Sequence, residues 1–239
     1  MTKTLTFLHT SPVHVATFDR LIAEIAPDLL VRHVVDESLL SEARAAGAIT
    51  PDLERRIDAT VRGAIEHDAA VVLCTCSTIG ACAEDIGLLT SAPVLRVDRA
   101  MAERAVALGP RILVAAALAS TLAPTRALLL DAAKRAGKTV RIGEVLCDSA
   151  WARFEQGDHA GYLAAIADCL RGAASDADVV VLAQASMAGA AALCADLPIP
   201  ILSSPRLGLE AAIRAYYAAY LSLQSGECVS PTPVRCQPE

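Results

Sequence analysis

Short β-branched runs alternate with longer Ala- and Leu-rich segments of helical period along this chain. Two of the runs, residues 70–73 and 179–182, are wholly apolar, which is typical of strands covered by helices on both faces of a sheet. Parallel strands need a crossover between them, and the Ala- and Leu-rich segments are long enough to supply it as helices. The alternation therefore predicts an α/β fold with parallel sheets.

The predicted elements follow the same order in the two halves of the chain. The closest internal match pairs residues 68–80 with residues 176–189, although Ala/Val-rich sequence also matches itself by chance. We interpret the match as a duplication that gives two Rossmann-like βα lobes with pseudo-twofold symmetry. The predicted strands are 5–8, 30–35, 70–73, 111–116, 139–146 and 179–182, and the predicted helices are 15–25, 51–67, 125–136, 159–174 and 207–223.

The expected boundaries follow from this repeat. Residues 1–97 form the first lobe, which the C-terminal helix 205–224 completes, and residues 98–204 form the second lobe. Residues 225–239, with three prolines and no periodicity, form a loose tail. Loops at the carboxyl ends of such sheets bind small ligands, so we expect the functional site in the cleft between the lobes.

Charge and hydropathy restrict the classes of partner. The 239 residues are 54% hydrophobic and carry a formal charge of −6, with neither sign gathered into a long run. We therefore expect a small-molecule partner, with no binding to nucleic acid or membrane. The sequence shows no export signal, so we expect a cytoplasmic protein whose eight cysteines are reduced thiols. Whether it forms a homo-oligomer is left open.

Cys74 and Cys76 follow the apolar run 70–73 and precede a helix expected to begin near Ile79. Free amides and the positive dipole at a helix N-terminus favour a thiolate, so either cysteine is a candidate base or nucleophile. The alternative is that both only fill space at a tight turn. A metal site that adds Cys82 is not expected, because the spacing lacks the paired cysteines or histidines of compact zinc sites.

The segment Thr75-Cys76-Ser77-Thr78, which follows a Val-Val-Leu strand, resembles the alanine-cysteine-asparagine-threonine signature of aspartate and glutamate racemases. Residues 8–12 occupy the first strand-to-helix loop, where that superfamily places small polar residues, and residues 118–121 occupy the corresponding loop of the second half. Residues 182–187 fall where the family has leucine-glycine-cysteine-threonine. The resemblance covers nearly the whole chain in the order of its elements, although its motifs are short.

The resemblance implies that Cys76 is the catalytic cysteine, and an alignment shifted by two residues would make it Cys74. Gln184 stands where a two-base racemase has its second cysteine, and an amide side chain cannot serve as that acid. His9, His14 and Cys147 are alternative groups that could enter the cleft from other loops. Hydroxyl side chains in the same loops are expected to bind the substrate carboxylate, with helix capping as the alternative for each. These residues are Thr10, Ser11, Ser77, Thr78, Thr121 and Ser186.

The implied activity is cofactor-independent chemistry at the carbon next to a carboxylate, in a small acid or an amino acid. Racemisation or epimerisation is the first expectation. One-cysteine decarboxylation or isomerisation is the alternative, since the relative arylmalonate decarboxylase uses a single cysteine, and a noncatalytic carboxylate-binding protein is the third. The sequence shows no Gly-rich nucleotide loop and no pyridoxal lysine motif, so no organic cofactor is predicted. Three Phe, one Trp and four Tyr give no indication of a large aromatic pocket.

Overall fold

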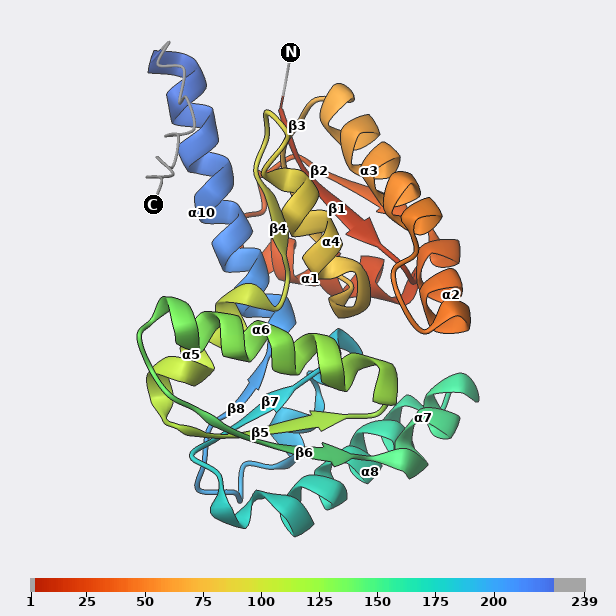
Figure 1. Ribbon diagram of the computed structural model, residues 1–239, viewed down its shortest axis with the longest axis vertical. Coiled ribbons are helices and arrows are strands. Elements are labelled where there is room, and N and C mark those ends of the chain that lie inside the picture. The colour runs from red at the N-terminus through yellow and green to blue at the C-terminus, as the bar shows by residue number, and fades with distance from the viewer. Residues whose placement is uncertain (1–2, 226–239) are drawn as a thin grey trace, which may run out of the picture.

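The computed structural model describes residues 3–225 of the chain. Two four-stranded parallel sheets lie one in each half, with the order β2-β1-β3-β4 in the first and β6-β5-β7-β8 in the second (Figure 1). The second sheet repeats the topology of the first, which confirms the predicted α/β class with two similar lobes. The strands are β1 (Thr4–His9), β2 (Val31–Val35), β3 (Ala69–Cys74), β4 (Val94–Arg96), β5 (Arg111–Ala116), β6 (Arg141–Leu146), β7 (Val179–Leu182) and β8 (Ile201–Ser203).

Helices cover both faces of the first sheet. One face packs on α2 (Glu37–Ala46), α3 (Pro51–Glu66) and α4 (Ser77–Gly87), and the other packs on α1 (Val13–Ile25) and α10 (Ser204–Ser225). The side chains of β3 alternate between these two cores, as the period of a strand requires. Val72 and Cys74 enter the first core, whereas Val71 and Leu73 enter the second.

The second sheet is covered in the same way. One face packs on α5 (Arg99–Leu108) and α6 (Leu122–Arg135), and the other packs on α7 (Asp148–Glu155), α8 (His159–Ala173) and α9 (Ala190–Leu193). Short 3₁₀ turns lie at Ala119–Thr121, Ala174–Asp176 and Ala185–Met187. Among the helices of residues 3–225, none combines the length and the apolar character needed to cross a membrane.

The final helix crosses from the second lobe back to the first. α10 follows β8 but packs against β3 and α1, where Leu209, Ala212 and Ile213 are buried (Figure 1). Residues 226–239 of the expected tail lie outside the described residues.

Local sequence signals account for the start of the longest predicted helix of the first lobe. The Thr50 hydroxyl accepts a hydrogen bond from the Leu53 amide at 3.2 Å, and Pro51 occupies the first helical position. Both features are favourable at a helix N-terminus, where the first amides have no partner inside the helix. α3 therefore begins at the predicted residue.

Other boundaries differ from the prediction. α4 begins at Ser77 rather than near Ile79, because the chain passes from β3 into the helix through only Thr75 and Cys76. α2, α5, α7, α9 and β4 were not predicted. β4 has three residues and α7 has eight, which is too short for a clear hydrophobic period.

The contact between α10 and the segment after β4 gives a stability prediction. A Cβ atom on Gly208 would lie 2.2 Å from the Val97 carbonyl oxygen, whereas a Cβ on Gly172 of α8 would meet nothing within 4 Å. Gly208→Ala should lower the free energy of unfolding by about 1–3 kcal/mol through overpacking. Gly172→Ala should raise it by about 0.5–1 kcal/mol, because alanine is the better helix former. Urea denaturation measures both, and equal stabilisation by the two variants would contradict the close packing of α10.

Candidate functional site

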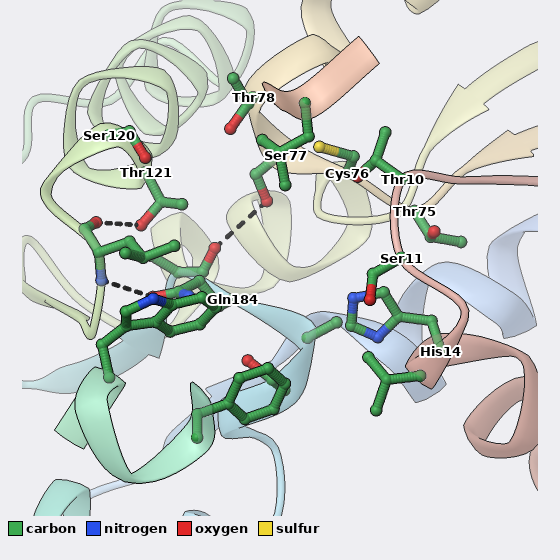
Figure 2. Close-up of a pocket in the computed structure, with 18 residues that line it drawn as sticks. Thr10, Ser11, His14, Thr75, Cys76, Ser77, Thr78, Ser120, Thr121 and Gln184 are labelled. Carbon is green, nitrogen blue, oxygen red and sulfur yellow. Dashed lines mark hydrogen bonds between the residues drawn. The ribbon is translucent and has the colours of Figure 1, made fainter. Parts of the chain in front are cut away.

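A cavity lies between the two lobes, at the carboxyl ends of both sheets. Loops that follow β1 and β3 line it from the first lobe, and loops that follow β5 and β7 line it from the second. Cys76, Gln184 and all six predicted substrate-binding residues lie in its wall (Figure 2). The full lining is Thr10, Ser11, Val13, His14, Leu40, Thr75, Cys76, Ser77, Thr78, Leu118, Ser120, Thr121, Trp151, Phe154, Ala183, Gln184, Ala185 and Ser186.

The structure separates the two candidate cysteines. Cys76 is partly exposed in the cavity wall and occupies the N-cap position of α4, where no side chain bonds to the free amides. Cys74 is the last residue of β3, is fully buried in the core beneath α2, α3 and α4, and does not line the cavity. Burial raises the pKa of the Cys74 thiol, so Cys74 stays protonated. Of these two thiols, only Cys76 can contact a ligand in the cavity.

A direct contact between the lobes lies beside Cys76. The Ser77 hydroxyl donates to the Ala183 carbonyl oxygen at 3.2 Å (Figure 2).

Two other hydroxyls of the cavity wall have partners within the second lobe. The Thr121 hydroxyl donates to the Leu118 carbonyl oxygen at 2.8 Å, and the Ser186 hydroxyl shares a 2.9 Å hydrogen bond with the Tyr162 hydroxyl. Burial raises the pKa of Tyr162 to about 12, so this hydroxyl keeps its proton.

The hydroxyl side chains of the cavity wall do not cap the helices that begin there, which was the alternative to ligand binding. The helices that begin at this cavity, α1, α4 and α6, have N-caps without a side-chain hydrogen bond. Thr10, Ser11 and Thr78 make no side-chain hydrogen bond within the described part of the chain, so their hydroxyls are available to a ligand. The cavity thus presents free hydroxyls and helix amides on the same side as Cys76.

Gln184 is held rigidly by backbone groups. Its Oε1 accepts hydrogen bonds from the Ala117 amide at 2.7 Å and the Leu118 amide at 2.9 Å, and the residue is only 9% exposed. An acceptor that satisfies two buried amides stabilises the loop after β5 against the loop after β7. An amide side chain does not act as an acid or a base near neutral pH. Gln184 therefore gives this part of the second-lobe wall no acid or base.

The three groups considered as replacements for a second cysteine lie in different places. His14 lines the cavity, and burial lowers its pKa, so it is neutral at pH 7. His9 lies behind the wall and contacts Thr75. Cys147 does not line the cavity either: its thiol lies 2.6 Å from the Cys169 sulfur, and burial raises its pKa. Only His14 can contact a ligand directly.

Sequence reasoning missed the aromatic part of the wall. Trp151 and Phe154 of α7 stack with ring centroids 4.8 Å apart and an interplanar angle of 22°. The Trp151 Nε1 donates to Glu155 at 2.7 Å, so its polar group is satisfied outside the cavity and its ring is available for contact. Their spacing of three residues places both on one face of a helix, and this signal would have been useful only if α7 had been predicted.

Charged side chains are absent from the cavity wall: among the described lining residues there is no Lys, Arg, Asp or Glu. Asp98 forms a buried ion pair with Arg96 at 2.6 and 3.0 Å, and Arg99 pairs with Glu84 and Asp131. These ion pairs lie outside the cavity wall. No group of three or more His, Cys, Asp or Glu within residues 3–225 could hold a metal ion.

Comparison with known families places this site in context. The family model of the Asp/Glu/hydantoin racemases matches residues 11–212. The chain belongs to this family. The match includes both lobes and the cysteine segment, in agreement with the resemblance in the sequence. No curated protein sequence matches the chain.

Several solved structures share the fold. The aspartate racemase of Picrophilus torridus superposes with a TM-score of 0.67 at 14% identity and covers 90% of this chain and 95% of its own. The allantoin racemase of Klebsiella pneumoniae gives 0.62 at 14% identity, with coverage of 100% and 97%. Arylmalonate decarboxylase gives 0.59 at 16% identity, with coverage of 89% and 92%. At these identities the likeness shows the fold alone.

The different surroundings of the thiols give a labelling prediction. Iodoacetamide should modify Cys76 in the folded protein and leave Cys74 unmodified, because the thiolate is the reactive form and Cys74 is buried and protonated. Cys82, on the same helix as Cys76, should react slowly, because burial and nearby carboxylates raise its pKa to about 11. Peptide mass spectrometry over a time course measures the order. Modification of Cys74 before Cys76 would contradict the assignment of Cys76 to the cavity.

Proposed function

We propose that this protein is a cofactor-independent enzyme that transfers a proton at the carbon next to a carboxylate, with Cys76 as the acid. The observation that carries the proposal is the position of Cys76 at the start of α4, in the wall of a cavity lined with hydroxyls. Removal of a proton or of carbon dioxide at this carbon leaves negative charge on the remaining carboxylate. Free amides of α4 and the hydroxyls of Thr10, Ser11 and Thr78 can stabilise that charge through hydrogen bonds.

Gln184 favours one-sided chemistry. In racemisation through two thiols, one group removes a proton from one face of the carbon while the other delivers a proton to the opposite face. Gln184 cannot take the second role. We therefore favour decarboxylation or isomerisation. In decarboxylation the bond to carbon dioxide breaks, its electron pair stays on the substrate carbon, and the Cys76 thiol donates its proton to that carbon. A proton from solvent then restores the thiol.

Racemisation is the second candidate, and His14 is the observation that favours it. His14 lines the cavity and is neutral at pH 7, so it can accept a proton and then return one. It would replace the missing second cysteine only if it reaches the face of the substrate opposite Cys76. Family membership alone supports both candidates, because the solved structures with this fold include racemases and a decarboxylase.

The uncharged wall restricts the substrate. An α-amino acid carries an ammonium group, and burying that charge without a carboxylate partner is unfavourable. The cavity offers no such partner among its described lining residues. Trp151 and Phe154 instead offer an apolar surface to a substituent. We infer a small carboxylic acid without an ammonium group and with a flat apolar substituent.

The activity test uses deuterated water and a panel of methylphenylmalonate, phenylpropionate, L-aspartate and L-glutamate. Carbon dioxide release with deuterium entry indicates decarboxylation, and deuterium entry with loss of optical activity indicates racemisation. Cys76→Ala should lose about 10²–10⁴ of the rate, because it removes the proton-transfer group. Cys82→Ala is the matched control on the same helix and should keep the rate. Binding without deuterium entry would leave a noncatalytic carboxylate-binding protein, and full activity in Cys76→Ala would overturn the role of the thiol.

Trp151 gives a direct test of the substrate class, because it is the single tryptophan of the chain. In the Cys76→Ala variant, phenylacetate should change the tryptophan fluorescence at concentrations where L-aspartate and L-glutamate do not. Phe154→Ala should weaken phenylacetate binding by about 1.5 kcal/mol, roughly tenfold, through lost aromatic contact. Calorimetry checks the affinities. Tighter binding of either amino acid would contradict the inferred substrate class.

A further inference from the structure

A chain of hydrogen-bonded side chains crosses the first lobe and ends at the cavity wall. The Asp19 carboxylate of α1 lies 3.0 Å from His33 Nε2, His33 Nδ1 lies 2.8 Å from His9 Nε2, and His9 Nδ1 lies 2.8 Å from the Thr75 hydroxyl. α1, β2, β1 and the turn after β3 each contribute one residue. Thr75 lines the cavity and directly precedes Cys76.

The two ends of this chain differ in their access to water. The Asp19 side chain is 55% exposed at the outer end, whereas Thr75 is 3% exposed and borders the cavity. Between them His9 is fully buried. Its ring stacks on His33 with centroids 5.1 Å apart and is flanked by Phe7 and Phe18. The chain therefore joins an exposed carboxylate to the cavity wall through His33, whose side chain is 17% exposed, and through the fully buried His9.

The four side chains can distribute their protons in two ways that leave every hydrogen bond of the chain with one donor and one acceptor. In the first, the Thr75 hydroxyl donates to His9 Nδ1, His9 Nε2–H donates to His33 Nδ1, and His33 Nε2–H donates to Asp19. Both histidines are then neutral. Asp19 fixes the direction of these bonds, because a carboxylate can only accept and His33 Nε2 must therefore carry a proton. Every ring nitrogen of the two histidines then has a hydrogen-bond partner.

In the second arrangement the bonds between the side chains reverse. The Thr75 hydroxyl donates to the Leu8 carbonyl oxygen at 3.2 Å, His9 Nδ1–H donates to Thr75, and His33 Nδ1–H donates to His9 Nε2. His33 still donates Nε2–H to Asp19 and is therefore a cation. The two arrangements differ by one proton, and His9 is neutral in both.

The surroundings place the charge of the second arrangement on His33. Burial, together with the proximity of His33 and His14, lowers the pKa of His9 to about 3. His33 has the Asp19 carboxylate beside it. The ionisable groups near the His9 ring are His14 of α1 and His33 of β2, and the ionisable group beside the His33 ring on α1 is Asp19.

We propose that Asp19, His33, His9 and Thr75 form a relay that exchanges one proton between the cavity and the outer surface of the first lobe. In the conversion of the second arrangement to the first, the Thr75 hydroxyl turns from the Leu8 carbonyl toward the cavity and releases its proton to a basic group there. His9 then gives its Nδ1 proton to the Thr75 oxygen, and His33 gives its Nδ1 proton to His9 Nε2. The reverse sequence takes up one proton. The relay rests on the proposed function, because one-sided protonation consumes one solvent proton in each turnover and leaves Cys76 as the thiolate.

The first test is independent of activity. In ¹⁵N-histidine NMR of the full-length protein, acidification that converts the first arrangement to the second should move the His9 proton from Nε2 to Nδ1 while His9 stays neutral. Thr75→Val should abolish this change of tautomer, because His9 Nδ1 loses the hydroxyl that donates to it in the first arrangement and accepts from it in the second. A His9 tautomer that stays the same when the His33 ring carries both protons would overturn the relay, whether or not the protein is active.

The second test uses decarboxylation of methylphenylmalonate in weak buffer. His33→Ala should lower kcat by about 10²-fold, at the low end of the usual contribution of proton transfer, with little change in KM. Added imidazole should restore much of the rate, which a merely structural defect would not allow. His67→Gln, which changes an exposed histidine at the end of α3, is the control and should keep the wild-type rate.

The outcomes separate the two proposals. An active wild type whose kcat is unchanged in His33→Ala, or is reduced and not restored by imidazole, would overturn the relay and leave the proposed function intact. A wild type that is inactive on the whole substrate panel would instead overturn the proposed function. The change of the His9 tautomer in the NMR experiment would then decide the existence of the relay by itself.

Discussion

The carboxyl ends of β3 and β7 meet across the interface between the lobes, and the site depends on this contact. Each is a central strand of its sheet, and helices cover both of its faces, so its polar side chains can appear only where the strand ends. The hydrogen bond from Ser77 to the Ala183 carbonyl joins the two ends directly. Cys76 and Gln184 are consequently brought to one cavity by segments that lie more than one hundred residues apart in the chain.

Gln184 gives the cavity its asymmetry. Its carbonyl oxygen accepts hydrogen bonds from the two backbone amides after β5, so the residue stabilises the second lobe and offers no acid to the cavity. The Cys76 thiol, in contrast, makes no hydrogen bond within residues 3–225 and lies in the cavity wall at the start of α4. The proposed chemistry follows from this difference, because the first-lobe wall presents an exchangeable proton and the second-lobe wall presents hydrogen bonds and aromatic surface.

The sequence was sufficient for the parts of the structure that depend on local patterns. The apolar runs that became β3 and β7 predicted the central strands, Thr50 and Pro51 marked the start of α3, and the Thr75–Thr78 segment located one wall of the cavity. Features that depend on tertiary contacts were not accessible in this way. The partners of Gln184 lie in a loop 66 and 67 positions away, and α7, which carries Trp151 and Phe154, is too short to show a period. The hydrogen-bonded chain from Asp19 to Thr75 required three strands and a helix to be placed together.

The stereochemistry of proton delivery tests the central claim most directly. Methylphenylmalonate has two equivalent carboxylates, and its decarboxylation in deuterated water creates a stereocentre that carries one deuteron. If Cys76 alone donates the proton from the first-lobe wall, the deuterated phenylpropionate should form as a single enantiomer from the earliest time point. Chiral chromatography with mass spectrometry measures its composition. A product that is racemic from the start, while the enzyme-free reaction is negligible, would contradict one-sided delivery by Cys76.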